Sequence, residues 1–79
     1  MRLNVLFFGA TAETVGKRRV ELDVPADATA GSVLESLLSH HPKLRSHQLL
    51  YSVNEEYASG PEKLSEGDEL AVFTAVSGG

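Results

Sequence analysis

The sequence contains no cysteine among its 79 residues. Disulfides, thiolate metal sites, iron–sulfur clusters and a cysteine nucleophile are therefore excluded. A chain of this length forms one domain, whose small core leaves a net stability of only a few kcal/mol. A large enzyme is excluded as well.

The sequence also lacks an excess of positive charge, because 7 Lys and Arg residues stand against 11 Asp and Glu residues and give a formal net charge of −4. A mildly acidic domain binds the phosphate backbone poorly, so no nucleic-acid partner is expected. The apolar segment 3–10 is interrupted by Asn4 and preceded by one basic residue, which is typical of a strand rather than of a signal peptide or a membrane span. We therefore expect a soluble cytoplasmic protein without a membrane partner.

Motifs for catalysis and for phosphate binding are missing too. No Gly-x-Ser-x-Gly elbow frames a serine, and the internal glycines are scattered rather than gathered in a phosphate loop. His40 and His41 are adjacent, and the carboxylates have no ligand-like spacing, so we interpret both histidines as solvent-exposed residues at a helix end. We expect this chain to bind no metal and no cofactor.

The first half of the chain predicts two strands and a helix. Residues 3–8 are almost continuously apolar, and residues 18–24 alternate between apolar and charged side chains, which predicts two strands that pair antiparallel. Residues 10–16 form a connector with at most one helical turn. Thr29 can cap a helix that ends near His40, because Pro42 cannot continue it.

The second half predicts three more strands. They comprise residues 49–53, a short edge strand at Tyr57, and residues 70–74 after a tight turn that needs Gly67. This order predicts an α+β fold of the β-grasp (ubiquitin-like) type, a mixed sheet with one main helix packed on one face. A ferredoxin-like fold is the alternative, but it needs a second helix, and residues 59–63 contain both Gly60 and Pro61. We expect a β-grasp domain over residues 1–74 and a flexible tail over residues 75–79.

One face of this sheet is expected to be an interaction surface. If Leu3, Val5 and Phe7 face the helix, strand alternation places Leu6, Phe8 and Phe73 on the other face. An exposed apolar patch on a small domain indicates a partner-binding surface. The alternative is that a loop or the Tyr57 edge covers it. The basic cluster 17–19 is interpreted as a solvated turn rather than a docking patch.

The sequence ends in Gly78 and Gly79. Because glycine has no Cβ, an extended Gly-Gly segment can enter a channel too narrow for other residues and present its carboxylate to a partner's reaction centre. A frayed terminus is the alternative. A free carboxylate is a poor electrophile and must first be activated, for example as an acyl adenylate, which requires ATP bound by another protein.

Several motifs, in order and over the whole chain, closely resemble the molybdopterin synthase small subunit family (MoaD). They are Val5-Leu6-Phe7-Phe8-Gly9, Val53-Asn54-Glu55, Glu66-Gly67-Asp68-Glu69-Leu70, and Val72-Phe73 followed by Val76-Ser77-Gly78-Gly79. Many members carry Pro-Pro before the final residues, where this chain has Thr74-Ala75.

The resemblance implies a non-catalytic, sulfur-donating subunit of a sulfurtransferase complex. It implies that an E1-like enzyme (MoeB type) adenylates Gly79 with Mg-ATP, and that a sulfurtransferase then converts Gly79 to a thiocarboxylate. The large subunit (MoaE type) receives this group and uses it to deliver sulfur to cyclic pyranopterin monophosphate in molybdenum cofactor biosynthesis, in a heterotetramer of two small and two large subunits. Gly78 is the implied tail spacer, and Leu6, Phe8, Phe73 and Val76 are the implied partner-binding residues.

Three alternatives remain open at this point. A ThiS-like sulfur carrier for thiamine thiazole synthesis shares the fold and the Gly-Gly end. A ubiquitin-like modifier would instead join its glycine to lysines of target proteins. A simple interaction module would carry an inert tail.

Overall fold

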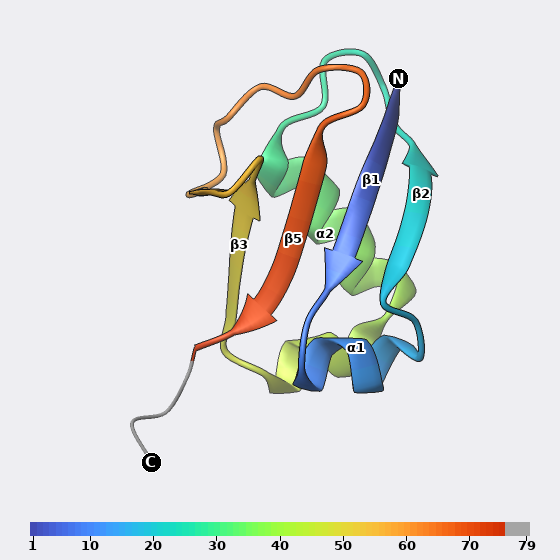
Figure 1. Cartoon of the computed structure of the whole chain (residues 1–79), viewed down its shortest axis with the longest axis vertical. Helices are drawn as coiled ribbons and strands as arrows, with labels where there is room; N and C mark the ends of the chain where they lie inside the picture. The colour runs from blue at the N-terminus through green and yellow to red at the C-terminus, as the bar shows by residue number, and fades with distance from the viewer. Residues whose placement is uncertain (76–79) are drawn as a thin grey trace.

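The computed structural model describes residues 1–75 and contains five strands, two α-helices and one 3-10 helix in this part of the chain (Figure 1). In chain order these are β1 (Arg2–Phe7), α1 (Ala10–Val15), β2 (Arg19–Asp23), α2 (Ala30–His40), the 3-10 helix η1 (Pro42–Ser46), β3 (Leu49–Val53), β4 (Glu56–Tyr57) and β5 (Glu69–Thr74).

The strands form one mixed sheet in the order β2-β1-β5-β3-β4. β1 and β5 pair in parallel at the centre, with Val5 opposite Leu70, whereas the other neighbouring pairs are antiparallel. α2 crosses one face of this sheet (Figure 1). The sequence prediction of a β-grasp fold is thus confirmed.

The core lies between this sheet and α2. Side chains on one side of each central strand meet the apolar stripe of the helix, as their alternation predicts. Full burial of one such side chain contributes about 1.5–3 kcal/mol. The core is made of Leu3, Val5, Phe7, Ala28, Ala30, Val33, Leu37, Leu38, Leu44, Leu64, Leu70 and Val72.

Both ends of α2 agree with the sequence prediction. The Thr29 hydroxyl accepts a hydrogen bond from the Ser32 backbone N–H, and the Ser32 hydroxyl oxygen accepts one from the Thr29 N–H, so the two residues form a capping box. Pro42 follows the C-cap residue His41 and opens η1. Gly67 has a φ of 83° in the turn before β5, which explains the need for glycine there.

The structure adds two elements to the prediction. The connector after β1 is a six-residue helix, α1, which ends at Gly16 in the left-handed conformation. η1 follows α2 and buries Leu44 completely. Its proline-initiated turn, rather than any apolar repeat, defines it, and so a search for periodicity overlooks it.

The interpretation of both histidines as exposed is wrong for one of them. His40 is exposed, but His41 is half-buried and its ring meets the Phe7 ring edge-on, with centroids 6.5 Å apart. The chain turns at His41 into η1, and this turn brings its ring against the core.

Within residues 1–75, no helix is long and apolar enough to cross a membrane.

Candidate partner-docking surface

The sheet face that α2 does not cover carries apolar side chains from both central strands. On β1, Leu6 is half-buried, and Phe8, just after the strand, keeps 51% of its surface exposed. Leu6 lies opposite Ala71 in the pairing with β5, so the adjoining Phe73 belongs to the same face. The structure therefore brings together the three residues that the sequence indicated.

Two further residues belong to this face, of which Leu50 was missed at the sequence level and Tyr57 was named there only as a possible cover. Leu50 lies opposite Phe73 in the β3–β5 pairing and is 37% exposed. Tyr57 lies opposite Ser52, and its ring centroid is 5.9 Å from that of Phe73. The alternation of residues 49–53 could have indicated Leu50, but only the strand order reveals that it adjoins Phe73. We call Leu6, Phe8, Leu50, Tyr57 and Phe73 the apolar face.

Tyr57 contacts Phe73 but does not cover the other residues of the apolar face. Its side chain is itself 77% exposed, and Phe8 remains half exposed. The strand β4 is only two residues long, and the Ala58 N–H just after it donates one more hydrogen bond to the Tyr51 carbonyl of β3. Within residues 1–75, the alternative that the Tyr57 edge covers this surface therefore holds only for the contact of Tyr57 with Phe73, whereas Phe8 and Leu50 stay exposed.

A buried threonine fixes the end of β1 against β5. The Thr11 hydroxyl oxygen lies 2.7 Å from the Phe8 carbonyl oxygen and 2.9 Å from that of Val72, and it accepts a hydrogen bond from the Phe8 N–H at 3.0 Å. The Phe8 N–H also donates to the Val72 carbonyl. Hydrogen bonds therefore join the backbone at Phe8 to the backbone at Val72, next to Phe73.

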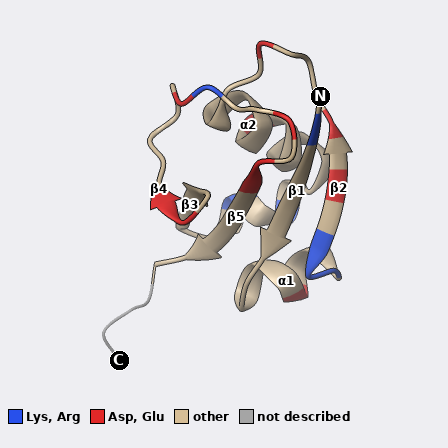
Figure 2. Cartoon of the chain, turned by 45° about the horizontal axis from the view of Figure 1, so that its top comes forward, with Lys and Arg blue, Asp and Glu red and all other residues tan. Residues whose placement is uncertain are grey.

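Positive charge borders one end of the apolar face. A hollow of about 470 Å³ is lined by Leu6 and Phe8, by the basic residues Arg18 and Arg19, and by one acidic residue, Glu13. Figure 2 shows this basic segment at the start of β2, whereas acidic residues cluster near β4 and the start of β5. A partner surface with apolar groups and an acidic group near Arg18 would complement this end.

The chain leaves the sheet beside the apolar face. Thr74 ends β5, and the Ala75 N–H donates to the Gln48 carbonyl at 3.2 Å. Three of the expected functional residues, Val76, Gly78 and Gly79, lie outside the described residues. Gly79 follows Phe73 by six residues, so it can lie at most roughly 20 Å from Phe73 along an extended chain.

The described side chains offer no evident metal centre. In residues 1–75, no group of three or more His, Asp or Glu side chains is placed to hold a metal ion. His47 instead shares a hydrogen bond between its Nε2 and the Thr14 hydroxyl oxygen at 2.8 Å.

Comparison with known proteins identifies the family. The model of the ThiS family matches residues 5–79, almost the whole chain. The chain belongs to the ThiS family. The resemblance to the molybdopterin synthase small subunit is confirmed by a Mycobacterium tuberculosis relative, the molybdopterin synthase sulfur carrier subunit, which is 33% identical over 100% of this chain and 99% of its own length.

Other relatives carry a different name. The small archaeal modifier protein 1 of Haloferax volcanii is 42% identical over 91% of this chain and 94% of its own length. A crystal structure of that protein superimposes over 100% of both chains with a TM-score of 0.87 at 36% identity. A structure of the complex of subunits 1 and 2 of the molybdopterin-converting factor from Helicobacter pylori contains the same fold, with a TM-score of 0.72 at 20% identity and coverage of 100% of both chains.

Proposed function

We propose that this chain is the sulfur carrier subunit of a molybdopterin synthase. The observation that carries the proposal is an open apolar face on β5, the strand that leads to Gly78 and Gly79. The full-length similarity to a relative named as that subunit supports it.

Gly79 performs the chemistry in this proposal. An activating enzyme of the MoeB type transfers AMP from Mg-ATP to the Gly79 carboxylate, and pyrophosphate leaves. A sulfurtransferase then supplies sulfur at the oxidation level of sulfide, which attacks the acyl carbon as AMP leaves, so Gly79 becomes a thiocarboxylate. A thiocarboxylate is ionised at neutral pH and more nucleophilic at sulfur than a carboxylate is at oxygen. Because the chain has no cysteine, none of its side chains can carry the sulfur as a persulfide.

The apolar face positions this tail. A large subunit of the MoaE type binds Leu6, Phe8 and Phe73, with Val76 continuing the contact along the chain. Docking at Phe73 fixes the start of the tail, and the six residues that follow are long enough to enter a neighbouring reaction centre. There two thiocarboxylates deliver two sulfur atoms to cyclic pyranopterin monophosphate, which suits an assembly of two small and two large subunits. The two-subunit complex of the Helicobacter pylori protein supports the large-subunit partner.

A second function uses the same activation. The 42% identical relative is named a modifier protein, which favours a ubiquitin-like role in which a lysine amine of a target attacks the activated Gly79 and forms an isopeptide bond. A ThiS-like role in thiazole synthesis also shares the activated glycine, and the ThiS family match is consistent with it. The acceptor of the acyl or sulfur group separates the three functions.

Reconstitution tests the proposal. The full chain is incubated with a MoeB-type enzyme, Mg-ATP, a sulfurtransferase and a sulfur donor, and its intact mass is measured before a MoaE-type subunit and the pterin precursor are added. We expect a mass gain equal to the replacement of one oxygen by sulfur, followed by loss of this gain as the dithiolene forms. The variant that lacks Gly79 should show neither change. Full dithiolene formation by this variant would contradict the proposal, and isopeptide adducts without a thiocarboxylate would favour the modifier role.

A further inference from the structure

β2 forms one edge of the sheet. Among the described strands, β2 pairs only with β1, along the edge of β1 that faces away from β5 (Figure 1). This edge lies two strands away from Phe73, and of its residues only Arg19 also lines the hollow beside Leu6 and Phe8.

The backbone of β2 presents a regular set of hydrogen-bonding groups to this edge. The Val24 N–H donates to the Met1 carbonyl, and the Arg18 carbonyl accepts from the Phe7 N–H. Because neighbouring residues of a strand point their N–H and C=O groups in opposite directions, the even-numbered residues between these contacts face β1. The backbone groups of Arg19, Glu21 and Asp23 therefore point outward, ready to pair with another strand.

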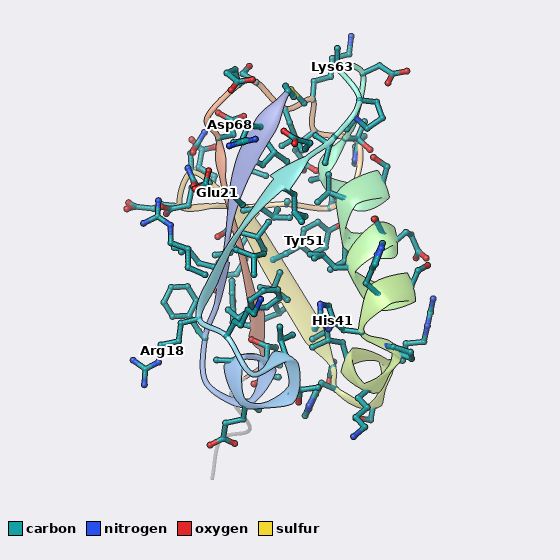
Figure 3. All side chains as sticks on the ribbon, turned by 90° about the vertical axis from the view of Figure 1, so that its right-hand side faces the viewer. Arg18, Glu21, His41, Tyr51, Lys63 and Asp68 are labelled. Carbon is teal, nitrogen blue, oxygen red and sulfur yellow. The ribbon has the colours of Figure 1, made fainter. Side chains whose placement is uncertain are left out.

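The side chains of the even-numbered and odd-numbered residues of β2 lie on opposite faces of the sheet. Val20 and Leu22 point toward α2 but are only half-buried. They line a groove of about 540 Å³ together with Leu37 and His40 of α2, and the charged residues Lys17, Glu21 and Asp23 also border it. Arg19, Glu21 and Asp23 are exposed on the other side, and Figure 3 shows Glu21 pointing away from α2. An added strand would thus extend both an apolar row and a charged row.

The charged row is complementary to itself. When two β2 strands pair, their outward N–H and C=O groups can hydrogen-bond only in registers that place an odd-numbered residue of one copy opposite an odd-numbered residue of the other. With Val20 at the centre of an antiparallel pair of two β2 strands, Arg19 of each copy faces Glu21 of the other. A shift by one such step in either direction places Glu21 opposite Glu21 or Arg19 opposite Arg19, and like charges directly opposite are destabilising.

We propose that a second copy of this chain pairs with β2, edge to edge and antiparallel, in the register centred on Val20. The contact is isologous, so each opposite-charge pair occurs twice. The two Val20 side chains meet beside the groove. Arg19 now donates to the Asn4 side chain, and Glu21 accepts from Arg2, but a guanidinium has five donors and a carboxylate accepts several hydrogen bonds, so both can serve a second partner.

Such a dimer has one continuous sheet with its two-fold axis perpendicular to the sheet. Both α2 helices lie on one side, and both apolar faces lie on the other side, where they remain open. The dimer therefore does not compete with docking of a partner at Phe73, and its existence does not depend on the role proposed for Gly79.

Analytical ultracentrifugation of the full chain from micromolar to millimolar concentration measures the association. We expect a reversible monomer–dimer equilibrium that weakens as salt is added, because exposed charge pairs are screened. Hydrogen exchange measured by NMR should show that the amides of Arg19 and Glu21 become protected as concentration rises. A chain that stays monomeric at millimolar concentration, or a dimer in which these amides remain unprotected, would overturn the proposal.

Charge reversal tests the register. Arg19→Glu should raise the dimer dissociation constant by about tenfold or more, since two attractive pairs become repulsive. The double variant Arg19→Glu with Glu21→Arg restores opposite charges across the pair and should recover dimerisation. Lys43→Glu is the matched control, because it changes the net charge equally from η1 and should have a much smaller effect. Equal weakening by Lys43→Glu, or no recovery in a folded double variant, would contradict this register.

Discussion

The hydroxyl oxygen of Thr11 lies 2.9 Å from the carbonyl oxygen of Val72 and thereby joins α1 to β5 across 61 residues of sequence. Thr11 is fully buried, and its hydroxyl also contacts the backbone of Phe8. This contact fixes the backbone beneath the apolar face from inside the fold. It gives a small helix of six residues a structural role beyond connecting β1 to β2.

Replacing this hydroxyl should destabilise the fold. Thr11→Val keeps the side-chain volume but removes the hydrogen bonds to Phe8 and Val72, so we expect a loss of about 1–3 kcal/mol in the free energy of unfolding. Urea denaturation measures it. Thr11→Ser, which keeps the hydroxyl, should lose less, and Ser46→Ala on the surface of η1 is the control. A Thr11→Val variant as stable as the wild type would show that the hydroxyl contributes nothing net.

The apolar face should contain the residues that dominate partner binding. Phe8→Ala and Phe73→Ala are each expected to cost about 2 kcal/mol or more in binding to the large subunit, because the half-exposed Phe8 ring and the partly buried Phe73 ring become fully buried in the complex. Calorimetric titration measures the affinity. Leu34→Ala, on the half-buried flank of α2, is the control and should bind normally. Unchanged affinity of both folded phenylalanine variants would remove this face from the interface.

The penultimate residue should matter for chemistry but not for stability. Gly78→Trp is expected to impair adenylation and sulfur loading, since a bulky side chain cannot follow glycine through a narrow channel. Its melting temperature should equal that of the wild type, because the core residues lie between Leu3 and Val72. Mass spectrometry of the loading reaction and a thermal melt give the two values. Normal loading would argue against a threaded tail.

Glu62 should give the fold a specific pH dependence. Hydrogen bonds from the backbone N–H of Ser59, with help from that of Gly60, lower the pKa of the Glu62 carboxyl below its usual value of 4.5. A lowered pKa in the folded state means that this stabilisation is present above the unfolded-state pKa and is lost as pH falls through the folded-state pKa.

Urea denaturation between pH 7 and pH 3, a range of roughly four units spanning ordinary carboxyl pKa values, measures this effect. Stability should fall with acidification below 4.5, and Glu62→Gln should flatten part of this fall while lowering stability at neutral pH. Glu13→Gln, at an exposed position of α1, is the control. Identical pH profiles for Glu62→Gln and the wild type would show that the loop contacts of Glu62 do not contribute.

Much of this molecule could be predicted from local sequence patterns. Alternation along residues 3–8 and 18–24 defined two strands and their faces, and Thr29 and Pro42 defined the limits of α2, because these signals depend on neighbours within one turn or one pleat. The same local reasoning placed Leu6, Phe8 and Phe73 on one face. The Gly78-Gly79 motif, and with it the proposed chemistry, is also a property of the sequence alone.

Tertiary structure decided which of these faces meet. Leu50 and Tyr57 join the apolar face only because β3 pairs with β5, and Thr11 is buried only because α1 folds against the end of β5. The outward backbone of β2 follows from its place at the sheet edge. These features depend on pairing between residues far apart in the chain, and such pairing is selected by the free energy of the whole core rather than by any local sequence signal.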